Sequence, residues 1–271
     1  MHPITFPNLG LELDINPVAF NILGRDIYWY GIIIVSGIIL ALFLAWKNRD
    51  TYGISWDTLT DFAFIAIPFG IICARIYYVA FEWDYYKNNL SEIIKIWNGG
   101  IAIYGAIIGG IVTAIAFCKK RKIKLLDLCD FCAPYLALCQ AIGRWGNFVN
   151  REAYGEITNS FLKMGIFNDS IGEYIYVQPT FLYESICTFI IFCVLYSYRH
   201  SKKFSGEIFY LYMTLYGIAR FVVEGFRADS LYLYGFRVSQ VLALIFAVVF
   251  GIMLLKTKGK MKKANKDWQK C

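Results

Sequence analysis

Long apolar stretches are the feature that most constrains how this 271-residue chain folds. Crossing the hydrocarbon core of a bilayer takes about 20 apolar residues, each adding about 1.5 Å of helix. Charged residues make up only 17% of the chain, whereas a soluble domain has about 25%. The sequence therefore predicts an all-α, polytopic membrane protein. The candidate transmembrane helices are seven: residues 27–46, 62–81, 99–118, about 126–146, 180–198, 207–225 and 238–255.

The distribution of lysine and arginine predicts the orientation of these seven helices. Cytoplasmic loops of membrane proteins carry an excess of basic residues. The loops after the first, third and fifth stretches and the C-terminal tail together hold 17 Lys and Arg residues, and the opposite side holds seven. We therefore expect the N-terminus outside and the C-terminus in the cytoplasm. The expected divisions are an outer segment (1–26), a seven-helix catalytic domain (27–255) and a basic cytoplasmic tail (256–271).

The formal net charge of +7 does not indicate a nucleic-acid-binding protein, because most basic residues lie in the predicted cytoplasmic loops and tail. Contact with anionic membrane lipids accounts for them. Residues 1–26 lack the basic start and apolar stretch of a cleavable signal peptide. Cys129 and Cys132 form a lone C-x-x-C with no nearby histidine, so we expect them to pack in the core. We predict no metal site and no cofactor.

Charged residues inside the predicted helices need partners or a function. One arginine near the bilayer centre costs about 2.5–3.5 kcal/mol. Arg75, Arg144 and Arg220 lie within predicted helices, and the direction of each helix places them in the outer half of the membrane. This convergence predicts an outward-facing cavity inside the membrane. The same half is expected to hold Tyr30, Tyr104, Glu184, Glu224 and Gln240, whereas Asp130 lies near the inner end.

Two interpretations account for these charges. The first is structural pairing, of Arg220 with Glu224 one helical turn away and of Arg144 with Glu152 across a turn. The second follows from the excess of arginines over carboxylates at this level, which leaves positive charge available. A guanidinium binds phosphate through two parallel hydrogen bonds. The set as a whole therefore favours affinity for an anionic lipid headgroup.

One segment carries a specific resemblance. Residues 143–155 read Gly-Arg-Trp-Gly-Asn-Phe-Val-Asn-Arg-Glu-Ala-Tyr-Gly. This resembles the signature G-R-x-G-N-F-x-N-x-E-x-x-G of the prolipoprotein diacylglyceryl transferase family at every defined position. The resemblance extends over nearly the whole chain, through Trp29-Tyr30-Gly31, Ala74-Arg75, Trp97-Asn98-Gly99-Gly100, Asp130-Phe131, Gln178-Pro179, Tyr183-Glu184, and Tyr216-Gly217 with Arg220 and Glu224.

The resemblance implies a multi-pass enzyme of the bacterial plasma membrane, with its active site facing the outer leaflet. Such an enzyme transfers diacylglyceryl from phosphatidylglycerol to the lipobox cysteine of a prolipoprotein signal peptide, the first step of lipoprotein maturation. The second product is glycerol phosphate. The expected partners are these two substrates and membrane lipids, without nucleic acid.

Roles for individual residues follow from this chemistry. Arg144 and Arg220 are expected to stabilise the negative charge that grows on the leaving phosphate. Asn147 and Asn150 are expected to hydrogen-bond the headgroup glycerol. The glycines at 143, 146 and 155 are expected to let the backbone leave helical geometry beside the lipid. The predicted lipid-binding residues further include Tyr30, Arg75, Gly155, Glu184, Tyr216 and Gln240.

The proton acceptor stays open. Better-known family members have a histidine where this chain has Tyr104, and His2 and His200 lie at the terminus and on the predicted cytoplasmic side. The candidates are Tyr104, Tyr30, a carboxylate such as Glu152 or Glu224, and the departing phosphate itself. The spacing Gly105-x-x-x-Gly109 predicts close helix packing rather than chemistry.

Three other classes of membrane protein fit less well. An ion-coupled transporter would need polar residues near both faces and favours an internal repeat, but the inner half offers mainly Asp130 and no repeat is visible. A retinal-binding light sensor would need a lysine in the last helix, and residues 238–255 contain none. A purely structural protein would not explain the convergence of arginines.

Overall fold

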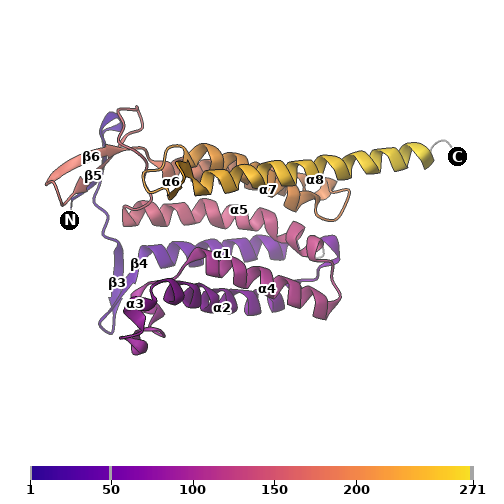
Figure 1. The fold of residues 1–271 in the computed structure, drawn as a ribbon, viewed down its shortest axis with the longest axis horizontal. Helices are drawn as coiled ribbons and strands as arrows, with labels where there is room; N and C mark the ends of the chain where they lie inside the picture. The colour runs from indigo at the N-terminus through magenta and orange to yellow at the C-terminus, as the bar shows by residue number, and fades with distance from the viewer. Residues whose placement is uncertain (1, 49–50, 269–271) are drawn as a thin grey trace. The chain divides into compact units, whose positions relative to one another are not determined.

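Long helices form most of the computed structural model, which describes residues 2–48 and 51–268 (Figure 1). Each predicted apolar stretch overlaps one of them. The sixth stretch, 207–225, matches its helix within one residue, and the fifth matches fully. The helices are α1 (Trp29–Lys47), α2 (Trp56–Phe81), a short α3 (Trp83–Tyr86), α4 (Ile103–Arg121), α5 (Leu125–Asn150), α6 (Thr180–Tyr198), α7 (Glu207–Glu224) and α8 (Val238–Trp268).

Six of these helices are long and apolar enough to cross a membrane: α1, α2, α4, α5, α6 and α8. In the part of the chain that the structure describes, α7 is the predicted span that does not qualify, because it carries Glu207, Arg220 and Glu224 within 18 residues. A polytopic helical membrane protein is therefore confirmed. The seventh span and the orientation of the termini stay predictions.

The third predicted stretch, 99–118, begins too early. Gly99 and Gly100 have φ of +85° and +75°, which an α-helix does not accommodate. The helix α4 therefore begins only at Ile103. At its other end α4 ends at Arg121, because the next residue, Lys122, has a φ of +56°.

Short strands show that the expectation of an all-α chain is wrong outside the helices. The N-terminal segment and the connection between α5 and α6 form one antiparallel sheet in the order β2-β1-β5-β6. Alternate side chains, among them Ile4 and Ile166, enter a core with Phe148 of α5 and Phe181 of α6. The sheet thereby fixes the ends of these two helices. The strands are β1 (Ile4–Phe6), β2 (Leu11–Leu13), β5 (Met164–Asn168) and β6 (Glu173–Val177), with separate hairpins β3 (Val18–Ile22)–β4 (Arg25–Tyr28) and β7 (Tyr232–Leu233)–β8 (Phe236–Arg237).

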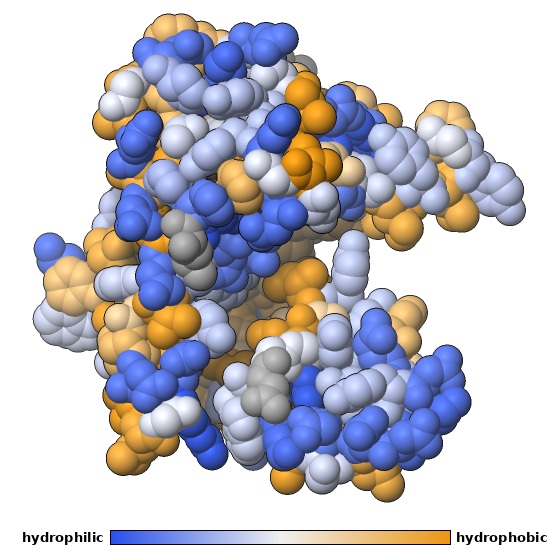
Figure 2. Space-filling view, turned by 90° about the vertical axis from the view of Figure 1, so that its left-hand side faces the viewer, coloured by the Kyte–Doolittle hydropathy of each residue, from blue (hydrophilic) through white to orange (hydrophobic). Residues whose placement is uncertain are grey.

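The strand-bearing end of the structure faces the viewer in Figure 2. Hydrophilic side chains gather in the upper part of this view, where β5 and β6 lie, and also at the lower right, and apolar side chains appear along the flanks. Apolar flanks suit helices that face lipid, and hydrophilic side chains suit the segments that meet water.

The chain forms two compact units, one of residues 1–45 with 132–271 and one of residues 46–131. Within the second unit, α2 and α4 pack closely, since a Cβ on Gly109 would lie 2.8 Å from the Cβ of Cys73. A Cβ on Gly105 would likewise collide with the backbone of α2. The close helix packing predicted for these two glycines is confirmed. The predicted boundaries at residues 26 and 255 stay predictions.

Candidate functional site

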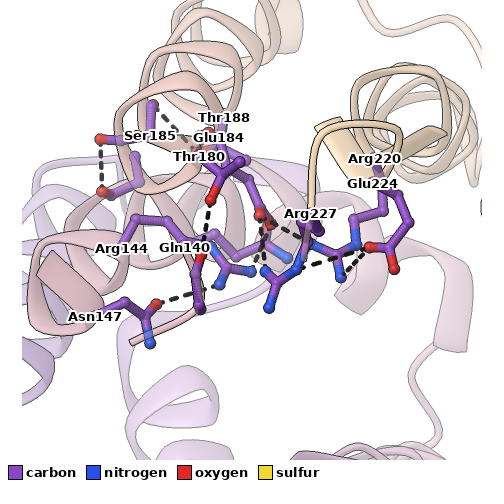
Figure 3. A network of polar contacts seen from close by, with 12 residues as sticks. Gln140, Arg144, Asn147, Thr180, Glu184, Ser185, Thr188, Arg220, Glu224 and Arg227 are labelled. Carbon is purple, nitrogen blue, oxygen red and sulfur yellow. Dashed lines mark hydrogen bonds and ion pairs between the residues drawn. The ribbon is translucent and has the colours of Figure 1, made fainter. Parts of the chain in front are cut away.

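A cluster of charged side chains joins α5, α6 and α7 in the first unit, where Arg144, Glu184 and Arg220 point toward one another (Figure 3). The Glu184 side chain is 2% exposed and lies at the centre. Its Oε1 lies 2.5 Å from Nη2 of Arg144, and its Oε2 lies 2.9 Å from Nη1 of Arg220. One buried carboxylate thus serves two arginines from different helices.

A second carboxylate, that of Glu224, completes the α7 side of the cluster. Its Oε2 lies 2.7 Å from Nη2 of Arg220, so the expected pairing of these two residues across one helical turn is confirmed. The hydroxyl of Ser230 donates to Oε1 of Glu224 at 2.9 Å. Glu224 is therefore buried with partners on both oxygens.

Sequence reasoning missed Arg227 as a member of this cluster. Its side chain is 11% exposed, and its Nη1 lies 3.9 Å from Oε2 of Glu184. Its guanidinium also donates two hydrogen bonds, of 2.9 and 2.7 Å, to the carboxylate of Asp229. Helical spacing gave no signal for it, because α7 ends at Glu224 and Arg227 lies beyond it, in an isolated β-bridge with Gly155. The structure places a third arginine beside the two that were predicted.

Asp229 lies outside the helices, and its environment shifts its proton affinity. Burial alone would raise the pKa of Asp229, but the hydrogen bonds and positive charge of Arg227 outweigh burial and lower this pKa below its usual value. Asp229 therefore remains a charged partner of Arg227 at neutral pH.

On the α5 side, the side chain of Asn147 lies between Arg144 and Glu152 and hydrogen-bonds both. Nη1 of Arg144 donates to Oδ1 of Asn147 at 3.2 Å, and Nδ2 of Asn147 donates to Oε1 of Glu152 at 2.8 Å. The direct pairing of Arg144 with Glu152 that the sequence suggested is therefore wrong, since Glu184 takes that place. Glu152 itself is exposed.

Two signature glycines stay helical, contrary to expectation. Gly143 and Gly146 lie inside α5, and a Cβ on Gly146 would lie 2.7 Å from the ring of Tyr30. Their small size lets α1 approach α5, which sets Tyr30 beside Arg144 and Glu152. The backbone leaves helical geometry after Asn150, the last residue of α5, and has positive φ at Arg151 (+54°) and Ala153 (+55°).

Gly155 allows a close approach of backbone to backbone. A Cβ there would lie 2.5 Å from the carbonyl oxygen of Phe226 and 2.5 Å from the Cβ of Gln178. Arg237 reinforces the same junction, because its Nη2 pairs with Glu156 at 2.6 Å and its Nη1 donates to the carbonyl of Glu224 at 2.5 Å. The segments after α5 and α7 are thereby fastened together beside the cluster.

The other predicted residues divide between the two units. Tyr216 lies beside Arg144, Glu184 and Arg220. Nε2 of Gln240 donates to the carbonyl of Phe221 at 3.1 Å, and Asn150 is the last residue of α5. The first unit thus holds Tyr30, Arg144, Asn147, Asn150, Glu152, Gly155, Glu184, Tyr216, Arg220, Glu224 and Gln240, and the second holds Arg75 and Tyr104.

In the second unit, Arg75 is 6% exposed and donates hydrogen bonds to main-chain carbonyls between α3 and α4. Tyr104, in the first turn of α4, is 53% exposed, and its ring centroid lies 6.2 Å from that of Tyr77. Whether these two residues touch the lipid stays a prediction.

The first-unit cluster has the chemistry of an anion site. Three guanidiniums meet two buried carboxylates. Arg144 directs one N–H at Glu184 and one at Asn147 and also contacts the hydroxyl of Tyr216, which leaves further N–H donors for a ligand. A guanidinium with free N–H groups in a water-poor site favours a phosphate. Among the described residues, no group of three or more His, Cys, Asp or Glu is arranged to hold a metal ion.

Comparisons with known proteins agree with this chemistry. Residues 17–256 match the family described as prolipoprotein diacylglyceryl transferase. A protein of Finegoldia magna named phosphatidylglycerol–prolipoprotein diacylglyceryl transferase is 48% identical over 249 residues, which cover 92% of this chain and 98% of that protein. Proteins of the same name from Clostridium novyi and Listeria welshimeri are 44% identical over 260 residues (93% of this chain, 100% of the relative) and 47% identical over 253 residues (91% of each). This chain belongs to the prolipoprotein diacylglyceryl transferase family.

Proposed function

We propose that this protein transfers the diacylglyceryl group of phosphatidylglycerol to the lipobox cysteine of prolipoproteins, the reaction that its relatives' names describe. The observation that carries the proposal is the Arg144–Glu184–Arg220 cluster around a buried carboxylate, because Arg144 belongs to the family signature and the cluster suits a phosphate. The substrates are a membrane lipid and a signal peptide, and the enzyme catalyses the first step of lipoprotein maturation.

The reaction is a displacement at carbon. The cysteine sulfur attacks the glyceryl carbon that bears the phosphate, a C–S bond forms, and the C–O bond breaks with its electron pair left on the phosphate oxygen. The products are a thioether-linked diacylglyceryl group and glycerol phosphate. Negative charge grows on the leaving phosphate, where Arg144 and Arg220 stabilise it through preorganised donors. Asn147 and Asn150 lie near enough in sequence to Arg144 to hold the headgroup glycerol.

The thiol proton needs an acceptor, because a free thiol of pKa about 8.5 is only a few per cent thiolate near neutral pH. Glu152 suits this role best, since it is exposed and receives one hydrogen bond from Asn147, next to Arg144. Glu224 suits it less, because it is buried and already pairs with Arg220 at 2.7 Å. Tyr30, Tyr104 and the phosphate are the alternatives.

The proposed architecture has seven spans, with α7 as the sixth in order. At about 1.5 Å per residue its 18 residues extend about 27 Å, close to the thickness of the hydrocarbon core. Its charges have partners inside the protein: Arg220 and Glu224 join the cluster, and buried Glu207 pairs with Lys258 of α8 at 3.1 Å. Internal pairing of this kind is what a charged membrane helix requires.

The proposed location is the bacterial plasma membrane, with the N-terminus outside, the C-terminus in the cytoplasm and the cluster at the outer leaflet. Single cysteines test the orientation. In intact cells, the Asn159→Cys variant is expected to react with a membrane-impermeant thiol reagent and the Lys120→Cys variant is not, each measured above the parent protein's own labelling. The reverse pattern would overturn both the orientation and the outer-leaflet site.

One assay tests the function directly. Purified protein in phosphatidylglycerol vesicles receives a lipobox peptide, and mass spectrometry follows the lipidated peptide and released glycerol phosphate. We expect transfer that requires phosphatidylglycerol and disappears when the lipobox cysteine is replaced by serine. Ion flux across the vesicle membrane without transfer would instead support a transporter.

A further inference from the structure

The second unit contains its own buried arginine site. The guanidinium of Arg75, on α2, meets main-chain carbonyls from the segment between α3 and α4. Nε donates to the carbonyl of Ile93 at 2.8 Å, and Nη2 donates to that of Glu92 at 2.6 Å. Nη1 donates to the carbonyls of Gly99 and Gly100, both at 2.7 Å. Arg75 thus ties together residues 92–100, which we call the carbonyl loop.

Main-chain dipoles, rather than carboxylates, hold this charge. The side chain of Glu92 pairs with Lys95 at 2.6 Å, and no ion pair of Arg75 with a carboxylate occurs within residues 2–48 and 51–268. The ring of Tyr86 lies 5.2 Å from the guanidinium carbon. Four of the five N–H donors of Arg75 are in use, whereas bidentate binding of a phosphate needs two parallel donors.

Two glycines give the loop the shape that this contact requires. Gly99 and Gly100 both have positive φ, which turns their carbonyls toward Arg75. A Cβ on Gly100 would lie only 2.5 Å from Nη1 of Arg75. Directly afterwards, the amide of Ala102 donates to the carbonyl of Ala74 at 3.1 Å, and α4 begins. The position of Arg75 therefore determines where the chain enters α4.

The burial of Arg75, which is 6% exposed, explains why its guanidinium needs these carbonyls. Arg75 precedes the end of α2 by six residues, or about 9 Å of helix. Irregular backbone at such depth is tolerated only where its carbonyls find donors, and a buried arginine needs acceptors in the same way. The carbonyl loop and Arg75 satisfy each other.

We propose that Arg75 is a positioning residue, which holds the carbonyl loop and thereby places Tyr104 in the first turn of α4, and that it does not bind the lipid phosphate. This differs from the lipid-binding role that the sequence suggested for Arg75. The inference deepens the transferase function proposed above and rests on it for the role of Tyr104.

Hydrogen exchange tests the structural half of the inference without any activity. In full-length protein reconstituted in phosphatidylglycerol vesicles, Arg75→Gln is expected to raise amide exchange over residues 92–105 by about tenfold or more, because the loop loses its donors. Residues 140–150 serve as the internal control and are expected to keep their protection. Unchanged exchange over 92–105 would overturn the inference, whether or not the protein proves to be a transferase.

Kinetics test the functional half. With Arg75→Gln we expect kcat to fall by about ten- to a hundredfold through misplacement of Tyr104, while the KM for phosphatidylglycerol stays within about twofold. Arg75→Lys is expected to rescue little, because one ammonium cannot replace four directed hydrogen bonds. A KM raised tenfold or more with kcat retained would identify Arg75 as a lipid ligand and overturn the proposal.

A glycine pair provides the matched variants. Gly100→Ala leaves every charge in place but sets a methyl group against Arg75, so it is expected to reproduce both effects of Arg75→Gln. Gly53 has a similar φ of +71°, and a Cβ there would meet no heavy atom within 4 Å, so Gly53→Ala carries backbone strain without the collision. If Gly100→Ala and Gly53→Ala exchange alike over residues 92–105, the contact with Arg75 does not hold the loop and the proposal fails.

Discussion

The two units hold buried arginines by different means. In the first unit, Arg144 and Arg220 contact the carboxylate of Glu184, which belongs to a third helix. In the second, Arg75 contacts the backbone of the carbonyl loop. A phosphate can compete with a carboxylate for a guanidinium while the backbone stays in place. It cannot replace four main-chain carbonyls unless the loop moves.

The role of an arginine inside a membrane protein is indicated by the group that it contacts more than by how deep in the membrane it lies. Either environment must offset about 2.5–3.5 kcal/mol for each arginine near the bilayer centre. Charge-assisted hydrogen bonds of about 1.5–3 kcal/mol each are sufficient in both units. In the first unit, Arg227 lies beside Arg144 and Arg220, and the partners of these arginines are side-chain carboxylates, which an anionic ligand can displace. The partners of Arg75 are main-chain carbonyls.

The largest expected effect is that of Arg144→Gln. We expect turnover to fall by about 10²–10³-fold, as for loss of one preorganised donor at a developing anion, and Arg144→Lys to recover only part of it. The transfer assay measures the rate, and hydrogen exchange over residues 92–105 is expected to stay unchanged, in contrast to Arg75→Gln. Near-normal turnover by a folded, membrane-inserted Arg144→Gln variant would contradict the phosphate-binding role.

Glu184→Gln tests the shared counter-ion. Removal of this buried charge leaves Arg144 without a carboxylate partner and Arg220 with Glu224 alone, so we expect a loss of about 3 kcal/mol in the free energy of unfolding. The control is Glu156→Gln, since Glu156 is an exposed partner of Arg237 and is expected to cost less than about 1 kcal/mol. Denaturant titration in detergent compares the two. Equal losses would show that Glu184 is not the central partner.

Tyr104→Phe compares chemistry with packing in the second unit. If the phenol hydrogen-bonds the headgroup or the thiol, the variant loses at least about tenfold in turnover, which corresponds to about 1.4 kcal/mol or more, while it still folds and inserts. Tyr104→His is expected to retain more activity than Tyr104→Phe, because imidazole restores a polar, protonatable group. Equal rates for Phe and Tyr would assign this side chain to packing and leave proton transfer to Glu152, Glu224 or the phosphate.

The smallest expected effect belongs to Asp229, whose side chain is 53% exposed. Its pKa is lower in the folded protein than the ordinary value of 3.8, so its stabilising contribution is present above that value and is lost as pH falls through the folded-state pKa. We expect Asp229→Asn to cost at most about 1 kcal/mol at pH 7, with the difference from the parent protein vanishing under acid conditions. Unfolding measured between pH 7 and pH 2 checks this. A difference that grew on acidification would reverse the sign of the argument.

Sequence reasoning located the helices well where apolar length alone decides. The fifth stretch coincides with α6, because a run of about 20 apolar residues has few alternatives in a bilayer. The sixth stretch matches α7 within one residue, although α7 carries three charged residues. It failed at residues 99–102, where two glycines with positive φ interrupt an otherwise apolar run. It also missed the sheet of β1, β2, β5 and β6, since strands of three to five residues carry little periodicity and two of them lie about 150 residues away from the other two.

The candidate site was partly predictable. The signature segment and the placement of charges in one half of the membrane identified Arg144, Arg220 and Glu184 as candidates, and the one-turn spacing predicted the pair of Arg220 with Glu224. The identity of the carboxylate that Arg144 meets was not predictable, because Glu184 lies 40 residues further along the chain and Glu152 only eight.

The sequence by itself determined that this chain is a helical membrane protein of the prolipoprotein diacylglyceryl transferase family, because apolar length and side-chain type are local properties that can be read residue by residue. Only the tertiary structure decided which arginines meet carboxylates and which meet carbonyls. Those partners come from different helices and loops, and the direction of a carbonyl depends on backbone angles that side-chain type does not specify. Arg75 and Arg144 therefore look alike in the sequence and differ in the fold.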